Sequence, residues 1–489
     1  MKKKLFLLVL VIVSQLSKAQ NVFNKIFDDS LTHDAFSAVC QALDGGYLLG
    51  GAVYTPSLGT ENLLLIKVNN IGDTVWQKIY SVSPPHGIDR AYSATQLPDS
   101  NFILCTTNFD TTDQQANAGL LKIDKNGNII WFHEYGDTLQ EIGYEAILTP
   151  DYGYLLCGWT YSYTNGMSDG YAVKTDSSGT VEWEKHFGGS QYDYFYSVTT
   201  TIDGGFLFGG TTSSYGFPGR AWLLKTNSFG DSLWQKGYPA GYGSGFGSIT
   251  KTSDGGFAIS GDMAQNASGD DVDAFVVKVN STGALQWSRT YGTSQNQEFQ
   301  GYGIFETSDN SLVCGGSIAY IDSSWTSTLK VDGWIMKLNN NNGDTIWNRT
   351  YYNKKNKEHY VEGMAASNDG GYLLCGYLLS NGIYLNDAWV VKVDSMGCDN
   401  FSSCFVGIPN EINNLTSEII VYPNPTSGKF TIESNTEIET VAIYNVLGEK
   451  IFSTATFPSE IDICKQPSGI YLLRLFSNEG TFVMKIVKE

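Results

Sequence analysis

The chain has 489 residues and a formal net charge of −19 at pH 7, and only 17% of its residues are charged while 13% are aromatic. The negative charge argues against nucleic acid and anionic membrane surfaces as partners, because both would repel the chain. The 53 glycines and the aromatic content are typical of an all-β protein with many tight turns, and the length allows more than one domain.

The first 19 residues have the features of a secretory signal peptide. The basic start MKKK is followed by the apolar run LFLLVLVIV, and the small residues Ser17 and Ala19 stand before a cleavage point at Gln20. No later stretch approaches the ~20 apolar residues that cross a bilayer. The sequence therefore predicts a signal peptide at residues 1–19 and an exported protein with no transmembrane segment.

Residues 44–397 repeat one pattern seven times. Each unit has an aspartate that opens a run such as DGGYLLGG, an apolar run ending in lysine, an Asn or Asp two residues later, and then a glycine. Six units add a tryptophan four residues after this glycine, and these tryptophans lie 51 to 60 residues apart. Such self-similarity is typical of repeat architectures. The aspartates are Asp44, Asp99, Asp151, Asp203, Asp254, Asp309 and Asp369, and the lysines are Lys67, Lys122, Lys174, Lys225, Lys278, Lys337 and Lys392.

Each unit predicts four strands, of the types DRAYSATQL, YLLGG, LLLIKV and TVWQKIY. The Asp-Gly-Gly and Asx-x-x-Gly segments between them are hairpin turns, because Asx side chains bond to the local backbone and glycine adopts positive φ. Seven four-stranded antiparallel units match a seven-bladed β-propeller. We interpret the repeated Asp and Lys as residues that lock each blade, and not as a ring of charge around a channel.

The seventh unit lacks the tryptophan strand, and the segment FNKIF at Phe23 resembles the WQKIY that begins at Trp76. We expect this N-terminal strand to complete the last blade and close the ring, which leaves no long unpaired edge. Phe401, four residues after Gly397, is the alternative candidate for the same position. The predicted propeller spans residues 20–400.

Function is expected where the units differ. Links between the second and third strands vary in length and carry aromatic residues, which often bind glycans or peptides when a rigid scaffold presents them. We therefore predict a ligand-binding face built from these loops, with part of the aromatic side chains packed against neighbouring loops instead. The loop aromatics are Tyr54, Tyr161, Tyr163, Tyr215, Phe217, Tyr320, Trp325 and Tyr384.

The eight cysteines fall into two groups. Cys105, Cys157 and Cys375 occupy a repeat position where other units have glycine or serine, which predicts a small buried site. Cys398 and Cys404 lie close together outside the repeats, and export permits disulfides, so this pair is the disulfide candidate. No spacing of cysteine or histidine suggests a zinc site.

The repeat pattern ends after Gly397. Residues 401–417 lack strand periodicity and are predicted to be a linker, while the alternating runs of residues 418–489 predict a small immunoglobulin-like β-sandwich. This segment resembles the C-terminal sorting domain, type A, of the type IX secretion system of Bacteroidota. The resemblance is carried by the YPNP motif, VAIYNVLGEKI, PSGIYLLRL and the terminal KIVKE, with Tyr422, Pro423, Asn424, Pro425, Gly428, Gly448, Gly469, Tyr471 and Lys485 as the sorting-signal residues.

The resemblance implies a route and partners. Proteins with this domain pass through the periplasm and cross the outer membrane by the type IX secretion machinery. In that family a sortase-like peptidase generally removes the domain, and the cargo is released or held on the cell surface. We therefore expect a secreted or outer-membrane-surface protein.

The leading functional hypothesis is a secreted or cell-surface propeller that binds a glycan or a protein. The alternative is a carbohydrate-active propeller enzyme, a glycoside hydrolase or polysaccharide lyase, which would need a catalytic group held around a pocket. No such group is apparent in the sequence, and no cofactor is predicted. The loop acids Asp270, Asp271 and Asp273 offer oxygen ligands for Ca²⁺, but SGDDVDAF lacks the full pattern of a known calcium loop.

Overall fold

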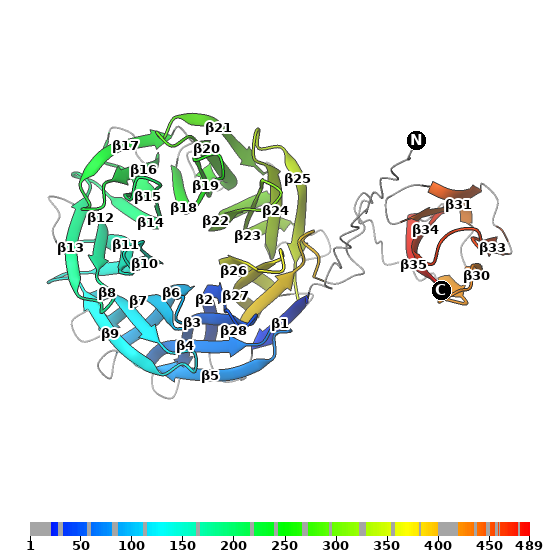
Figure 1. Cartoon of the computed structure of the whole chain (residues 1–489), viewed down its shortest axis with the longest axis horizontal. Coiled ribbons are helices and arrows are strands. Elements are labelled where there is room, and N and C mark those ends of the chain that lie inside the picture. Colours follow the sequence, from blue (N-terminus) through cyan, green and yellow to red (C-terminus); the bar gives the residue numbers. More distant parts are fainter. Residues whose placement is uncertain are drawn as a thin grey trace, which may run out of the picture. The chain divides into compact units, whose positions relative to one another are not determined.

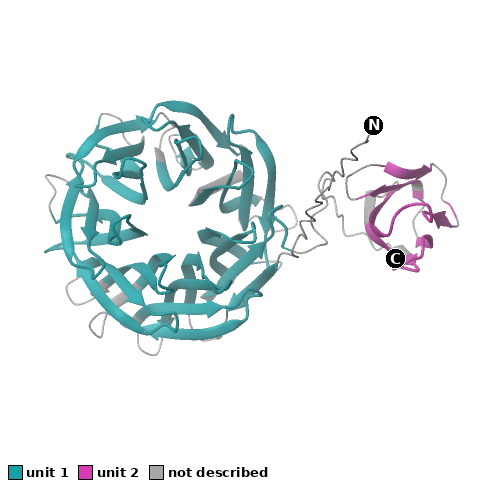
Figure 2. Cartoon of the chain, viewed as in Figure 1, with its two compact units in different colours: residues 1–404 teal, residues 405–489 magenta. Residues whose placement is uncertain are grey.

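The architecture is that of a computed structural model of the chain. The described residues are 21–27, 33–55, 60–80, 87–110, 115–162, 167–215, 220–238, 243–266, 272–292, 296–321, 329–353, 357–380, 383–399, 419–434, 438–445, 450–454, 458, 460–477 and 480–489. The predicted signal peptide and linker lie outside them. The chain divides into two compact units, residues 1–404 and 405–489 (Figure 2). Every helix or strand among the described residues is a β-strand.

Unit 1 consists of repeated four-stranded antiparallel sheets set around a propeller-like ring (Figure 1). In each sheet the first strand lies at the centre of the ring and the fourth at its rim. Six sheets are formed by consecutive strands. These are β2 (His33–Gln41), β3 (Tyr47–Thr55), β4 (Thr60–Val68) and β5 (Thr74–Tyr80); β6 (Gly87–Gln96), β7 (Phe102–Asp110), β8 (Gln115–Ile123) and β9 (Ile129–Tyr135); β10 (Glu141–Leu148), β11 (Tyr154–Thr160), β12 (Asp169–Thr175) and β13 (Val181–Phe187); β14 (Asp193–Thr200), β15 (Phe206–Thr212), β16 (Arg220–Thr226) and β17 (Ser232–Tyr238); β18 (Gly243–Lys251), β19 (Phe257–Ala264), β20 (Val272–Val279) and β21 (Leu285–Tyr291); and β22 (Asn296–Glu306), β23 (Ser311–Ile321), β24 (Leu329–Asn339) and β25 (Thr345–Tyr351).

The seventh sheet joins the two ends of the repeat region. It contains β26 (Glu358–Ala366), β27 (Tyr372–Ser380), β28 (Ile383–Val393) and, as its outer strand, β1 (Phe23–Phe27). β1 is antiparallel to β28, with Phe23 opposite Lys392. This is the pairing that the FNKIF segment predicts, whereas the rival Phe401 lies outside the described residues.

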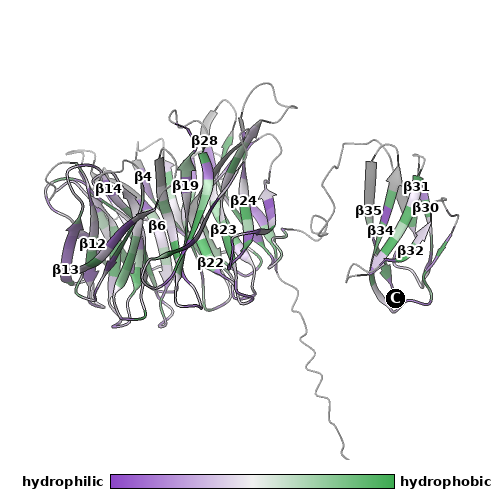
Figure 3. Ribbon diagram, turned by 90° about the horizontal axis from the view of Figure 1, so that it is seen from above, coloured by the Kyte–Doolittle hydropathy of each residue, from purple (hydrophilic) through white to green (hydrophobic). Residues whose placement is uncertain are grey.

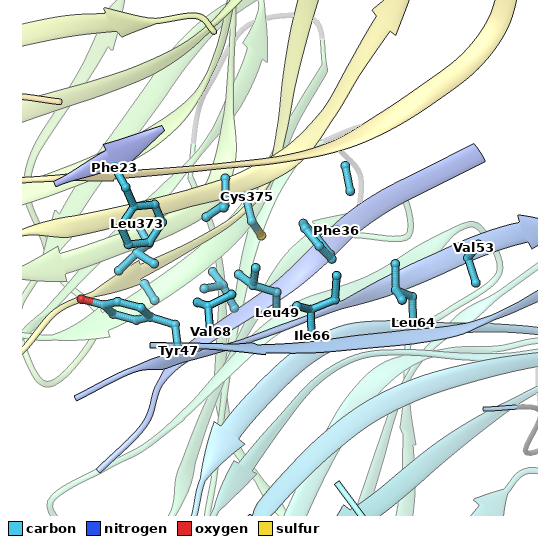
Figure 4. Packing of buried hydrophobic residues seen from close by; sticks show 14 residues of the cluster. Phe23, Phe36, Tyr47, Leu49, Val53, Leu64, Ile66, Val68, Leu373 and Cys375 are labelled. Atoms are coloured by element: carbon cyan, nitrogen blue, oxygen red, sulfur yellow. The ribbon is translucent and has the colours of Figure 1, made fainter. Parts of the chain in front are cut away.

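Phe23 anchors the closing strand. Its side chain is 7% exposed and lies with Leu373 and Tyr47 in a cluster of apolar side chains between two sheets (Figure 4). The Phe23 and Tyr47 rings are 6.1 Å apart. Asn24 accepts a hydrogen bond of 2.8 Å at Oδ1 from the indole Nε1 of Trp389. The ends of the ring are therefore held by apolar packing and a side-chain hydrogen bond, and not by backbone pairing alone.

The repeated lysine of the third strand pairs with the aspartate of the first turn in all seven sheets. Lys278 and Lys392 are the most buried of these lysines, at 1% and 0% side-chain exposure, and Lys278 Nζ lies 2.7 Å from Asp254. Several of the lysines also donate to the carbonyl of the following residue, as Lys67 does to Val68. The pairs therefore fasten the turn to the sheet, which is the structural role expected from the sequence. They are Lys67–Asp44, Lys122–Asp99, Lys174–Asp151, Lys225–Asp203, Lys278–Asp254, Lys337–Asp309 and Lys392–Asp369.

These turn aspartates make the stability of unit 1 sensitive to acid. Partial burial would raise the pKa values of Asp151 and Asp254, but hydrogen bonds from Lys174, Lys278 and nearby threonines outweigh it and lower both to about 2. A carboxyl whose folded pKa is depressed stabilises the fold above its unfolded value, ~3.9, and that contribution is lost as pH falls toward the folded value. We expect the urea midpoint, followed by tryptophan fluorescence, to fall steeply between about pH 4 and pH 2. A midpoint that stays constant over this range would show that the turn aspartates contribute little.

The repeated tryptophan of the fourth strand contacts the next sheet. Trp76 Nε1 donates to the Lys125 carbonyl at 3.2 Å, and Trp287 Nε1 donates to the Asn340 carbonyl at 2.8 Å. Each acceptor lies in the third turn of the following sheet. The tryptophan thus recurs because it holds neighbouring sheets together at the rim of the ring.

Unit 2 contains two antiparallel sheets. Apolar side chains of both form its core, among them Phe430, Val441 and Leu473, and Figure 3 shows the hydropathy of their strands. One sheet has the order β29-β30-β33 and the other β32-β31-β34-β35. The strands are β29 (Ile419–Tyr422), β30 (Lys429–Ser434), β31 (Ile438–Asn445), β32 (Lys450–Thr454), β33 (Ile461–Asp462), β34 (Gly469–Ser477) and β35 (Gly480–Lys488).

The YPNP motif holds the last strand of unit 2 in place. Asn424 Nδ2 donates to the Lys485 carbonyl at 2.6 Å, and Asn424 Oδ1 accepts from the Val487 backbone N–H at 2.9 Å. Tyr422 donates its hydroxyl to Glu433, and Gly469 begins β34. Gly448 lies outside the described residues. The motif and the C-terminal residues, which are 60 or so positions apart in the sequence, therefore form one structural element of this unit.

Candidate functional site

An irregularity recurs in the first strand of every sheet of unit 1. In β2, for example, the pairing with β3 shifts between Phe36 and Ala38, so that Ser37 is an extra, unpaired residue. A β-bulge of this kind re-aims a side chain and is frequent beside functional sites. The corresponding shift in β22 spans residues 301–302, whose side chains are outside the described part. The other bulge residues are Tyr92, Tyr144, Tyr196, Gly247 and Glu362.

The bulge residues line a cavity at the centre of the ring. The cavity has a volume of about 1070 Å³. Most of its lining residues belong to the first strands β2, β6, β10, β14, β18, β22 and β26. These strands lie around the centre of the ring (Figure 1). Its lining is unequal around the ring. Tyrosines line it from β6, β10 and β14, whereas β18 and β22 contribute Phe246 and Phe305 beside small residues such as Gly303. The tyrosines of the lining therefore come from three consecutive sheets.

Six rings form a continuous series from the cavity wall to the link between β11 and β12. Tyr92 and Tyr144 have centroids 5.2 Å apart, and Tyr144 and Tyr196 have centroids 5.0 Å apart. The remaining contacts are Tyr196–Tyr194 at 6.2 Å, Tyr194–Trp159 at 5.7 Å and Trp159–Tyr161 at 5.1 Å. All six side chains are half-buried. We call these residues, Tyr92, Tyr144, Tyr196, Tyr194, Trp159 and Tyr161, the aromatic series.

Arg90 lies at the inner end of the aromatic series. Its Nε donates to Ser37 Oγ at 2.8 Å, its terminal nitrogen pairs with Glu362, and its guanidinium lies 5.3 Å from the Tyr92 ring centroid. These contacts connect three successive sheets, the seventh, the first and the second. Because Glu362 compensates the charge of Arg90, the pair adds hydrogen-bonding groups to the cavity without adding net charge.

Glu145 is a second carboxylate of the cavity wall, and it has a structural partner. It accepts a hydrogen bond of 2.7 Å from the backbone N–H of Val198 in the next sheet, and burial raises its pKa. Ser93 and Ser197 accept equivalent bonds from Ala146 and Ile249, at 3.0 and 3.1 Å. The residue after the bulge thus bonds to the backbone of the following sheet, and this accounts for Glu145 without a ligand.

Asp262 is the third carboxylate of the cavity and differs from the other two. It lies in β19, its side chain is exposed to the solvent in the cavity, and desolvation raises its pKa to about 6. A hydrogen bond from the backbone N–H of Asp262 itself has the opposite effect and lowers this pKa in part. A half-desolvated carboxylate is therefore available to a ligand that enters the cavity.

The loop aromatics predicted from the sequence do not come together in a single site among the residues that the structure describes. Tyr161 belongs to the aromatic series. Tyr54 packs edge-on against His33, with centroids 5.5 Å apart, and Tyr215, which is 43% exposed, donates its hydroxyl to the Gly188 carbonyl at 3.1 Å. Tyr320 donates to Asp332 at 2.7 Å. Tyr163, Phe217 and Trp325 lie outside the described residues, as does the side chain of Tyr384 in β28.

Sequence reasoning missed the bulge residues of the cavity. Tyr92, Tyr144 and Tyr196 lie in strands in which aromatic and small residues alternate, and this alternation alone does not show which residues face the cavity. The bulge position could have been found by aligning the seven units of the repeat with one another. The residue at this position differs between units and is Ser37, a tyrosine in three units, Gly247 or Glu362.

The predicted cysteine and calcium positions are partly described. Cys398 is disulfide-bonded, and its proposed partner Cys404 lies outside the described residues. Cys105, Cys157 and Cys375 are buried free thiols, as expected for a small buried position. Asp270 and Asp271 lie outside the described part, while Asp273 is in β20. Within the described ranges no group of three or more His, Cys, Asp or Glu residues is placed to hold a metal ion.

Comparison with known families identifies the C-terminal region. Residues 420–489 match the secretion system C-terminal sorting domain, which confirms the resemblance described above and indicates export to a cell-surface or secreted location. No curated protein matches the chain. No helix in the described part of the chain is long and apolar enough to cross a membrane.

Three solved structures that are similar to the chain share 9–14% sequence identity with it. Sqt1 from Chaetomium thermophilum is 11% identical, with 76% of this chain and 99% of that chain covered and a TM-score of 0.42. BamB from Moraxella catarrhalis is 14% identical, with 73% and 85% covered and a TM-score of 0.35. The WD40 domain of SCAP from fission yeast is 9% identical, with 76% and 98% covered and a TM-score of 0.37.

Proposed function

We propose that this type IX secretion cargo is a seven-bladed β-propeller, residues 20–400, that binds a carbohydrate chain in its central cavity at the cell surface or after release. Seven four-stranded sheets and the pairing of β1 with β28 support the blade count and the closure. The sorting-domain match supports the route. Residues 418–489 then form an immunoglobulin-like sorting domain, which the type IX machinery handles and a sortase-like peptidase removes.

The aromatic series is the single observation that carries the carbohydrate assignment. Sugar rings present C–H groups on their faces and hydroxyls at their edges, so they stack on half-buried aromatic rings while polar groups bind their edges. Tyr144 and Tyr196 offer such rings, and Arg90, Glu362 and Asp262 offer polar groups in the same cavity. Rigid tyrosines also lose little conformational freedom on binding. A protein ligand on the variable loops is the second candidate, and the exposed Tyr215 supports it.

The cavity favours binding over glycoside hydrolysis. Most glycoside hydrolases use two carboxyl groups that flank the scissile bond. Among the described lining residues, Glu145 is engaged with the next sheet and Glu362 is paired with Arg90, which leaves Asp262 as the carboxylate without such a partner. Asp262 alone does not supply the acid and the nucleophile or base that the reaction requires.

Replacing Tyr144, which contacts two other rings of the series, tests the proposal. We expect Tyr144→Ala to weaken binding of the best oligosaccharide from a glycan array by about tenfold or more, since a lost stacking contact worth ~1.4 kcal/mol corresponds to a factor of ten. Isothermal titration of the mature chain gives this ratio. Tyr215→Ala is the matched control on the loop face and should bind as the unaltered chain does. Equal loss in both variants, or loss in Tyr215→Ala alone, would place the ligand on the loops instead.

A further inference from the structure

We infer that the cavity contains a subsite for an ammonium group, formed by the carboxylate of Asp262 and the aromatic face of Tyr196, and that the carbohydrate bound there contains amino sugars. This inference rests on the proposed carbohydrate binding and adds the chemical class of the ligand. It requires that Asp262 reaches the cavity, that no described group already compensates its charge, and that an aromatic face lies near it.

Asp262 reaches the cavity because its cross-strand neighbour has no side chain. It is opposite Gly245 of β18, and in the preceding sheet the corresponding pair is Tyr194 opposite Thr211. A Cβ on Gly245 would stand 2.6 Å from Thr211 Oγ1, so that a larger residue could not occupy this position without displacing its neighbour. Compared with the preceding sheet, this sheet therefore has Gly245 in place of Tyr194 and Asp262 in place of Thr211.

The charge of Asp262 is not compensated within the described residues. Arg90 is the cation among the cavity-lining residues, and it pairs with Glu362. The desolvated position of Asp262 raises its pKa, which is the response of a carboxylate that lacks a cationic partner. At pH 7 the group is nevertheless mostly ionised.

Tyr196 supplies the aromatic face. Its ring and the Asp262 carboxylate both line the cavity. Burial is the main cause of the raised pKa of the Tyr196 hydroxyl, and the neighbouring Tyr144, Tyr194 and Asp262 add to it. A cation near a ring face gains ~0.5–2 kcal/mol, and an adjacent carboxylate adds a charge-assisted hydrogen bond. Protonated hexosamines present an ammonium group directly on the sugar ring, so the same ligand satisfies the aromatic series and Asp262.

The test compares two ligands that differ in this group alone. We expect tetramers of β-1,4-linked glucosamine to bind the mature chain about tenfold more tightly at pH 7 than tetramers of N-acetylglucosamine, measured by isothermal titration. In Asp262→Thr, which restores the residue of the preceding sheet, the preference should disappear. Tyr215→Ala should retain it, and the unfolding midpoints of all variants are compared to check their folding.

The outcomes separate this inference from the proposed function. Equal binding of both tetramers by the unaltered chain overturns the ammonium subsite but leaves carbohydrate binding in place. Retention of the preference in Asp262→Thr overturns the assignment to Asp262. Binding of a lysine-rich peptide, with no binding of either tetramer or of any glycan on the array, overturns both.

Discussion

Deletion of residues 20–27 from the mature chain should destabilise unit 1 by more than any single substitution. β28 would lose its outer partner along five residue pairs, from Phe23–Lys392 to Phe27–Ala388. Loss of a buried phenylalanine side chain such as that of Phe23 alone costs ~3–5 kcal/mol, against a total stability of ~5–15 kcal/mol for a typical domain. The deletion should therefore unfold unit 1 or lower its urea midpoint severely, and the free edge of β28 should promote self-association. Circular dichroism and size-exclusion chromatography measure both effects.

A synthetic peptide of residues 20–31 provides the complementary control. An added strand can pair with an exposed sheet edge, so the peptide should restore part of the lost midpoint in a concentration-dependent way. Lys25→Ala is the mild substitution within the same strand. Its pair with Asp73 is partly exposed, at 33% and 59%, so its loss should lower the urea midpoint only slightly. A deletion variant with the midpoint of the intact chain would show that β1 does not close the ring.

Asp254→Ala should be a strongly destabilising substitution at a turn aspartate. It removes the carboxylate partner of Lys278, whose side chain is 1% exposed and whose Nζ lies 2.7 and 3.0 Å from the two carboxylate oxygens. An ammonium group left buried without its partner costs ~3–5 kcal/mol. Asp254 itself is 46% exposed, and Gln286 still accepts from Lys278 at 3.0 Å, so we expect about 3 kcal/mol, the lower end of that range. Urea unfolding of the two proteins measures the difference.

Two further variants identify the cause of this loss. Asp254→Ala combined with Lys278→Met removes both charges and should recover most of the stability, because a buried ion pair is often replaced by apolar residues at little cost. Asp99→Ala is the counterpart in a looser pair, in which Lys122 Nζ lies 3.8 Å from the carboxylate, and it should cost less. If Asp254→Ala and the double variant are equally unstable, the unpaired lysine is not the reason.

The repeat and its closure could be predicted from the sequence because they depend on residues that every sheet requires. A turn aspartate, a buried lysine and a rim tryptophan recur because each sheet needs the same contacts with its own turn and with its neighbour. FNKIF could be assigned to the last sheet on this basis, since its alternation matches the rim strand and the seventh unit lacks one. The sorting domain could be recognised for a similar reason, because Asn424 and the terminal strand contact each other directly.

The cavity could not be predicted in the same way. Strand alternation places side chains on two faces, but a bulge inserts one residue and reverses the assignment after it, so the orientation of Tyr144 depends on a local irregularity. Asp262 is exposed to the cavity because Gly245 lies opposite, and this pairing depends on strand register. The variable loops were a reasonable site to expect, but only Tyr161 among their described aromatics joins the aromatic series.

A crystal structure of the mature chain with its tightest-binding oligosaccharide is the most direct measurement of the central claim. We predict sugar rings stacked on Tyr144 and Tyr196 inside the central cavity, with a polar group of the ligand within hydrogen-bonding distance of Asp262. A ligand held on the outer links around Tyr215, with solvent alone in the cavity, would contradict it.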